Sequence, residues 1–100
     1  MRSEPYVTPD AQADILEAAR YYEGERAGLG FAFLDAIERA LTSIRDNPLL
    51  FTLVDEPVWR VLLQQFPYGV FYEPGDQQDT VLAVMDLRQD PETIRRSFRR

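Results

Sequence analysis

The chain contains no cysteine, no histidine and no lysine. The lack of cysteine excludes disulfides, thiolate metal sites and cysteine nucleophiles. The lack of histidine excludes zinc sites built on imidazole and every catalytic triad that uses a histidine base. All eleven basic residues are arginines, which stay charged at neutral pH and cannot serve as general bases. Acid–base chemistry in this chain would therefore depend on aspartate, glutamate, tyrosine or water.

Long apolar runs are also absent. No stretch of the sequence approaches the roughly 20 apolar residues of a membrane-spanning helix. Residues 1–5 are not followed by the apolar core of a signal peptide. We therefore expect a cytoplasmic protein without membrane contact. Its 100 residues correspond to one domain, residues 1–100, with a thin core.

Negative charge predominates, but it is unevenly distributed. The net charge is −6. Residues 1–87 hold fifteen acidic residues and six arginines, whereas residues 88–100 hold five arginines and two acidic residues. Nucleic-acid binding depends on a contiguous positive surface, which this distribution does not favour. An acidic body with a basic tail is better suited to a protein partner.

Two amphipathic helices are predicted in the first half. A short extended stretch at residues 5–7 precedes the first helix, which starts at Thr8-Pro9-Asp10, with Thr8 as its N-cap, and ends near Glu23-Gly24. The second starts at Gly28-Leu29-Gly30 and ends at Asp46-Asn47-Pro48. The short loop between them predicts an antiparallel hairpin. Its apolar stripes are Ala11, Ile15, Ala18, Ala19 and Tyr22, then Phe31, Leu34, Ile37, Leu41 and Ile44, widened by Phe33 and Ala40.

The second half predicts strands. Residues 59–64, 68–72 and 80–85 have strand composition and are separated by turn residues, which favours an antiparallel meander. The run at 80–85 is nearly all apolar, as in a strand buried on both faces. A short C-terminal helix is predicted from Pro91, with Asp90 as its N-cap. We therefore expect an α+β fold in which a helix hairpin packs on a mostly antiparallel sheet.

Three local signatures carry a family resemblance. They are Asp46-Asn47-Pro48, then Phe66-Pro67-Tyr68-Gly69-Val70-Phe71-Tyr72, then the segment Val81–Pro91 that contains Asp86, Arg88 and Asp90. In order and spacing they resemble the RelE/ParE superfamily of toxins, and the likeness covers nearly the whole chain. The resemblance implies a small toxin that a co-encoded antitoxin neutralises by wrapping its C-terminal segment around it. RelE-like members cut messenger RNA in the ribosome, and ParE-like members inhibit DNA gyrase.

The chain departs from the family pattern at two positions. Asp86 stands where many members have histidine, and Gln89 stands where many have a second arginine. The predicted strands carry only Arg60, so little positive charge converges to stabilise the phosphorane of RNA hydrolysis. A ParE-like inhibitor of gyrase is therefore the favoured interpretation. The alternatives are a RelE-like ribonuclease acting on ribosomes and mRNA, and a degenerate homologue that binds antitoxin without toxicity.

Five residues are candidates for target binding or catalysis. Arg60, Arg88, Arg95 and Arg96 would bind a target, and Arg60, Arg88 and Asp86 would serve catalysis if the chain were an enzyme. The competing interpretation of Arg60 is a solvent-facing side chain or a pair with Asp55 or Glu56, and that of Arg88 is a local pair with Asp86 or Asp90. Asp86 as a proton carrier would need a raised pKa, which a nearby arginine opposes.

The remaining expectations concern partners. The excess of the helical stripe is Phe33 and Leu29 with Tyr22 or Tyr21, and it is predicted to form an exposed seam for an antitoxin. The C-terminal arginines would either lie over the acidic body of the chain or meet an acidic patch on a partner. We expect no metal and no cofactor.

Overall fold

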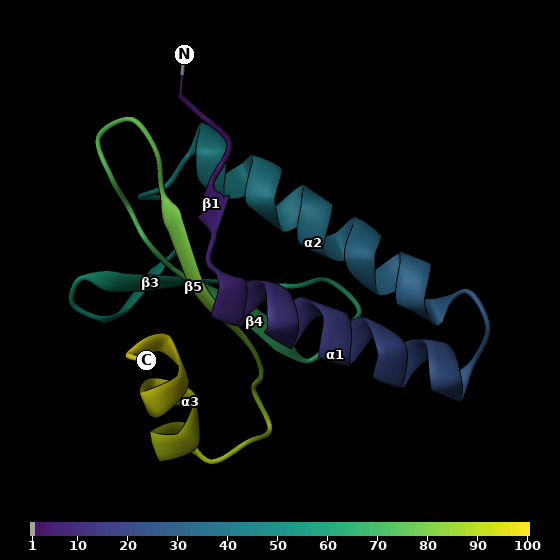
Figure 1. The fold of residues 1–100 in the computed structure, drawn as a ribbon. Coiled ribbons are helices and arrows are strands. Elements are labelled where there is room, and N and C mark those ends of the chain that lie inside the picture. Colours follow the sequence, from purple (N-terminus) through teal and green to yellow (C-terminus); the bar gives the residue numbers. More distant parts are fainter. Residues whose placement is uncertain (1) are drawn as a thin grey trace.

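The computed structural model describes residues 2–100, which fold into a helical first half and a stranded second half (Figure 1). The first half consists of β1 (Tyr6–Val7), α1 (Pro9–Glu25) and α2 (Leu29–Asp46). The second half consists of β2 (Thr52–Asp55), β3 (Val58–Leu62), β4 (Tyr68–Glu73), β5 (Thr80–Asp86) and α3 (Pro91–Phe98). The predicted α+β class, the helix hairpin and the short C-terminal helix are confirmed.

The strands form one sheet in the order β1-β5-β4-β3-β2. β1 runs parallel to β5, and the other neighbours are antiparallel, as the short connections predicted. Two expectations were wrong: β2 was missed, and β3 ends at Leu62 rather than at Gln64. β2 has four residues without clean alternation, and it is held by pairing with β3 rather than by a pattern of its own.

Side chains near the helix ends fix where the helices begin. The Thr8 hydroxyl accepts a hydrogen bond from the Ala11 N–H (3.1 Å), and the Asp90 carboxylate accepts one from the Thr93 N–H (3.1 Å). These are the N-caps that the sequence predicted, and each satisfies an N–H that has no partner inside its helix.

The turn of the hairpin depends on two glycines and one glutamate. Gly28 has φ of 93°, which favours glycine. A Cβ on Gly30 would stand 3.0 Å from the Ala19 carbonyl oxygen, so this glycine allows α2 to approach α1 closely. The Glu23 carboxylate accepts hydrogen bonds from the N–H groups of Gly28 (3.1 Å) and Gly30 (3.0 Å), and so caps α2 from the neighbouring helix.

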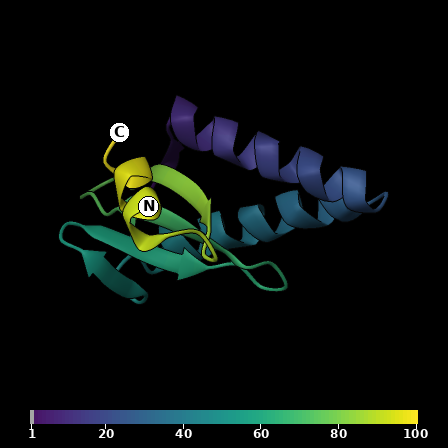
Figure 2. The same ribbon diagram turned by 90° about the horizontal axis from the view of Figure 1, so that it is seen from below.

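The sheet is covered on both faces. The hairpin packs on one face and α3 on the other, as the view from below shows (Figure 2). The hairpin core contains the residues predicted for α1 and most of those predicted for α2. Phe31 is an exception, because its side chain is 79% exposed whereas Phe33 is fully buried. Two residues turn a helix by about 200°, so Phe31 faces away from the sheet when Phe33 faces it.

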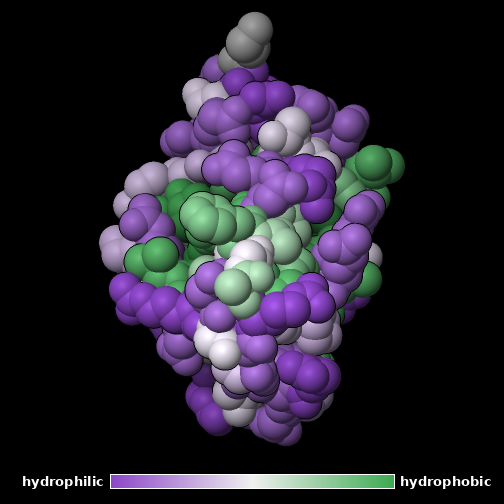
Figure 3. Space-filling model, turned by 90° about the vertical axis from the view of Figure 1, so that its right-hand side faces the viewer, coloured by the Kyte–Doolittle hydropathy of each residue, from purple (hydrophilic) through white to green (hydrophobic). Residues whose placement is uncertain are grey.

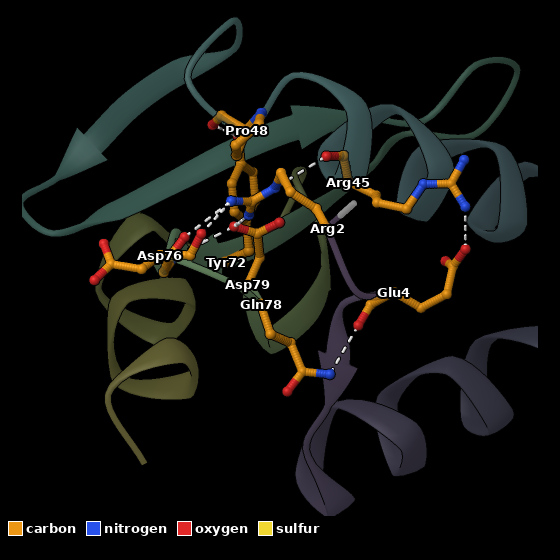
Figure 4. Close-up of polar contacts among 9 residues, drawn as sticks. Arg2, Glu4, Arg45, Pro48, Tyr72, Asp76, Gln78 and Asp79 are labelled. Atoms are coloured by element: carbon orange, nitrogen blue, oxygen red, sulfur yellow. Dashed lines mark hydrogen bonds and ion pairs between the residues drawn. The ribbon is translucent and has the colours of Figure 1, made fainter.

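A buried ion pair ties the N-terminus to the sheet (Figure 4). Asp79 is fully buried and accepts a hydrogen bond from the Arg2 guanidinium. Arg2 also donates to the carbonyl oxygens of Arg45 (3.1 Å), Gly75 (3.1 Å) and Asp76 (2.9 Å). The segment before β1, the end of α2 and the β4–β5 turn are therefore joined by Arg2, and removal of Arg2 would leave the buried Asp79 charge unpaired.

Tyr72 forms a further hydrogen bond in the same region, to the loop after α2. Its hydroxyl donates to the Pro48 carbonyl oxygen at 2.6 Å, and its ring is fully buried. Burial and the nearby Asp79 carboxylate raise the pKa of Tyr72 to about 12. Tyr72 is therefore a neutral hydrogen-bond donor at physiological pH. Within residues 2–100, no helix has both the length and the apolar character needed to cross a membrane.

Candidate functional site

Two of the three segments that carry the family resemblance, residues 66–72 and 81–91, meet at one end of β4 and β5. Tyr68 lies opposite Asp86 in the sheet, and the Leu87 N–H donates to the Pro67 carbonyl oxygen at 2.8 Å. Beside them, a hollow of about 400 Å³ lies against α1. Its polar lining is Asp14, Glu17, Tyr21, Tyr68, Asp86, Arg88 and Gln89.

Asp86 and Arg88 form a local ion pair at this hollow. The Arg88 Nε and Nη2 atoms donate to the two Asp86 carboxylate oxygens at 2.9 and 2.7 Å, and the Arg88 backbone N–H donates at 2.9 Å. These hydrogen bonds lower the pKa of Asp86, and the carboxylate in turn raises the pKa of Arg88. Asp86 is therefore ionised at neutral pH, which is unfavourable for a general acid.

Asp14 is a member of this hollow that the sequence did not reveal. Its carboxylate accepts a hydrogen bond from the Val84 N–H (3.0 Å) on β5 and one from the Arg100 guanidinium (2.8 Å). It thus joins α1 to the sheet and to the C-terminus. The sequence near Asp14 does not indicate this role, because its partners lie 70 and 86 residues away.

Arg60 lies on the opposite face of the sheet, under α3. It is opposite Phe71 in the β3–β4 ladder, and its stem crosses Gly69, where a Cβ would stand 3.1 Å from the Arg60 Cγ. Its Nε atom is buried and has no hydrogen-bond partner within residues 2–100. A buried N–H without a partner costs about 1–3 kcal/mol. Within residues 2–100, Arg60 does not form the expected ion pair with Asp55 or Glu56.

The two candidate arginines of the sheet do not converge. Arg60 lines a hollow of about 280 Å³ between the sheet and α3, and Arg88 lines the hollow beside α1. The lining of neither hollow includes the other arginine. Transition-state stabilisation on a phosphate requires several cations aimed at one point. This geometry does not bring Arg60, Arg88 and Asp86 together as a catalytic group.

Most of the C-terminal arginines pair with carboxylates of the same chain. Arg95 contacts Glu92 (2.6 Å) and Asp55 (3.8 Å), Arg99 also contacts Asp55, and Arg100 contacts Asp10 (3.3 Å) and Asp14. Arg96 differs, since its guanidinium contacts only the Thr93 hydroxyl, at 3.4 Å. The tail thus lies over the acidic body, and Arg96 has the fewest polar contacts of the C-terminal arginines within residues 2–100.

The predicted antitoxin seam on the hairpin is wrong in part. Phe33 is fully buried, and Tyr22 is half-buried against it. The rings of Tyr22, Phe33, Phe66 and Tyr68 lie with centres 4.8–6.0 Å apart and form part of the hairpin core. These aromatic residues fill the space between hairpin and sheet, which explains why the stripe looked too wide for a helix alone. Leu29 is half-buried.

Apolar side chains are exposed elsewhere. Figure 3 shows apolar surface gathered in the middle of one face and bordered by hydrophilic residues. The large exposed apolar side chains of the described chain are Tyr6, Leu16, Tyr21, Phe31, Leu49, Leu50, Leu53 and Leu62. Single exposed apolar residues are common on soluble proteins, so only those beside a groove or a free strand edge indicate an interface.

One such groove lies between α2 and β3. It measures about 250 Å³, and its walls are Ala36, Arg39, Ala40, Ser43, Phe51 and Val61 to Gln64. β2 pairs with β3 only as far as Arg60, so the outer edge of β3 is free beyond that residue. The Leu63 N–H donates inward to the Tyr68 carbonyl oxygen (2.9 Å), and the backbone groups of Leu62 therefore point outward. Leu62, whose side chain is 55% exposed, lies at this edge.

Comparisons with known proteins agree with this architecture. The family described as ParE toxin of type II toxin-antitoxin system, parDE, matches residues 6–91. No curated protein matches the chain. Among solved structures, a chain of the chromosomal ParDE toxin–antitoxin system from P. aeruginosa has the same fold, with a TM-score of 0.72 and 12% identity over 85% of this chain and 98% of that one. Because the family match covers most of the sequence, the chain belongs to the ParE toxin family.

Proposed function

We propose that the chain is the toxin of a type II toxin–antitoxin pair, that a cognate antitoxin holds it inactive, and that its target is a protein, DNA gyrase. The observation that carries the proposal is the match of residues 6–91 to the ParE toxin family. The fold shared with a chain of a ParDE system supports it. The gyrase assignment rests on the family resemblance.

The distribution of charge supports a protein target over RNA. Residues 1–87 have far more carboxylates than arginines. Arg60 and Arg88 line separate hollows, and most C-terminal arginines pair with carboxylates of the same chain. Arg88, whose side chain is 67% exposed, and Arg96 are the arginines best placed to contact a target.

The groove between α2 and β3 supports an interface for the antitoxin. An extended segment could add to the free edge of β3 through backbone hydrogen bonds, and its apolar side chains would enter the groove. This surface lies next to the hairpin but does not include Phe33. Leu29 stays a candidate contact, because its side chain is not fully buried.

The antitoxin surface is tested with two exposed leucines. Leu62 at the β3 edge and Leu16 on α1 are 55% and 50% exposed. The product of the adjacent gene would be purified with each variant, and its affinity measured by calorimetry. Leu62→Asp should weaken binding at least about tenfold, because it places a charge in a desolvated contact, whereas Leu16→Asp should leave it unchanged. Equal affinity of both variants and the parent protein would exclude this edge.

The target is tested with purified toxin in two assays. We expect inhibition of DNA supercoiling by gyrase, relieved by added antitoxin, and no cleavage of messenger RNA on programmed ribosomes. Arg88→Gln and Arg96→Gln should reduce the inhibition. Codon-dependent cuts in the RNA would favour the RelE-like alternative instead. Inactivity in both assays, with growth unaffected by soluble expression, would indicate a homologue that has lost its toxicity.

A further inference from the structure

The hollow under α3 has a composition that the proposed function does not use. It measures about 280 Å³ and lies between β3, β4 and α3. Its apolar lining is Val54, Phe71, Leu87, Pro91, Ile94 and Phe98, and its polar lining is Asp55, Arg60, Gln89 and Arg95. The hollow thus combines an apolar wall with charged groups, as sites for small organic groups do.

Arg60 is the unpartnered charge of this hollow. Its Nε is buried without a hydrogen-bond partner within residues 2–100. Asp55, the one carboxylate of the lining, is contacted by Arg95 and Arg99 instead. Two arginines against one carboxylate leave the lining with an excess of positive charge. An anion would therefore be favoured there.

The position of Arg60 depends on a neighbouring glycine. A Cβ on Gly69 would stand 3.1 Å from the Arg60 Cγ, 3.2 Å from its Cδ and 3.1 Å from the Leu87 Cδ2. These distances are shorter than ordinary van der Waals contact, so a larger residue would displace the arginine stem. Glycine at this position allows the stem of Arg60 to lie flat on the sheet beneath α3.

The chemistry of the walls selects among anions. Phosphate backbones are bound by several cations on an open positive surface, and this hollow has two arginines, one of which is already paired. Carboxylates match the planar guanidinium, which can donate two parallel hydrogen bonds to them. The apolar wall formed by Phe71, Leu87 and Phe98 suits an apolar group next to that carboxylate.

We propose that the hollow under α3 binds an acidic side chain that a protein partner presents beside an apolar one, with Arg60 as the anchoring residue. This site lies on the face of the sheet away from the hairpin, whereas the groove proposed for the antitoxin lies against α2. The proposal is therefore independent of which protein the toxin inhibits, and the two surfaces can be tested separately.

The test follows arginine Nε–Hε signals by NMR in the full chain labelled with ¹⁵N. The probes are acetyl-Leu-Asp-amide and acetyl-Leu-Asn-amide, which differ in one charge. We expect the aspartyl peptide to shift the Arg60 signal, and the asparaginyl peptide to bind about tenfold more weakly, as expected for loss of a charge-assisted hydrogen bond. Binding to the Arg60 variants, which lack the Arg60 signal, is followed through backbone amide shifts. Arg60→Gln should abolish binding, Arg60→Lys should retain only part of it, and Arg20→Gln, on an exposed face of α1, should not change it.

Three outcomes would overturn the proposal. The first is that neither peptide shifts the Arg60 signal at any soluble concentration. The second is that both peptides shift it equally, because the carboxylate would then contribute nothing. The third is that a single-stranded RNA hexanucleotide shifts it at lower concentration than the aspartyl peptide does. Amide spectra of each variant would be compared with those of the parent chain, so that loss of binding is not confused with loss of the fold.

Discussion

The two faces of the sheet are covered to different degrees. On the hairpin face, α1 and α2 bury a continuous core that includes four clustered aromatic rings. On the other face, the eight residues of α3 contribute only Phe98 to the buried core, and a hollow that contains Arg60 remains beside them. The hairpin face therefore supplies most of the buried core. The hollow proposed as a binding site lies on the thinly covered face, where a ligand would not disturb that core.

The largest effect on stability is expected from a substitution in the core between the hairpin and the sheet. Phe33→Ala should reduce the free energy of unfolding by about 3–5 kcal/mol, because it leaves a cavity in a fully packed core. Phe31→Ala is the matched control, two residues along the same helix and 79% exposed. We expect it to change stability by less than about 0.5 kcal/mol. Urea denaturation of both variants measures the difference, and equal effects would contradict the burial described for α2.

A smaller effect is expected on the α3 face. Phe98 stacks on Phe71 with ring centres 5.2 Å apart and is the buried residue of α3. Phe98→Ala should cost about 2–3 kcal/mol, at or below the usual range for a buried aromatic, because a terminal helix can detach without unfolding the sheet. Arg99→Gln removes an exposed ion pair with Asp55 and should cost less than about 1 kcal/mol. If Arg99→Gln were the more damaging change, α3 would be held by charge rather than by apolar contact.

The pKa of Tyr72 predicts how the hairpin face responds to alkali. The folded-state pKa of about 12 is above the ordinary value of 10.0, so the unfolded chain loses this proton first as pH rises. The stabilisation is therefore complete below about pH 10 and is lost between pH 10 and pH 12, by on the order of 2 kcal/mol. Tyr72→Phe should be less stable at neutral pH and should lose this part of the pH dependence. If the free energy of unfolding of the parent protein and of Tyr72→Phe fell equally between about pH 10 and pH 12, Tyr72 would not be the cause of the fall.

Local patterns predicted the elements whose ends are set by nearby residues. Thr8 and Asp90 were identified as caps because a cap acts within three residues. β2 was missed because its pairing with β3 holds it in place. One position of the α2 stripe was also wrong: Phe31 and Phe33 are both apolar, and only the position of the sheet decides which of them is buried.

In the candidate site, too, contacts between neighbouring residues could be predicted and contacts between distant residues could not. The pair of Asp86 and Arg88 could be predicted, because the residues are two apart. The pair of Arg2 and Asp79 could not, because 77 residues separate them. The hollow around Arg60 also depends on long-range structure, since α3 must fold back over β3 and β4 to enclose it. Sequence reasoning named Arg60 as a candidate residue but gave no indication of what surrounds it.

The smallest expected effect concerns Arg88, at the end of the sheet between the two faces. Its pair with Asp86 is exposed on the arginine side, so Arg88→Gln should change the free energy of unfolding only slightly. The pKa of Asp86, now lowered by hydrogen bonds from Arg88, should rise toward its ordinary value, as ¹³C NMR of the carboxyl group can measure. Because the folded-state pKa is lowered, the pair stabilises the protein above the unfolded pKa of aspartate and is lost as pH falls. In Arg88→Gln, the free energy of unfolding should therefore fall slightly less as the pH is lowered. An unchanged Asp86 titration would show that the pair is not formed in solution, and Asp86 would then regain its standing as a candidate proton carrier.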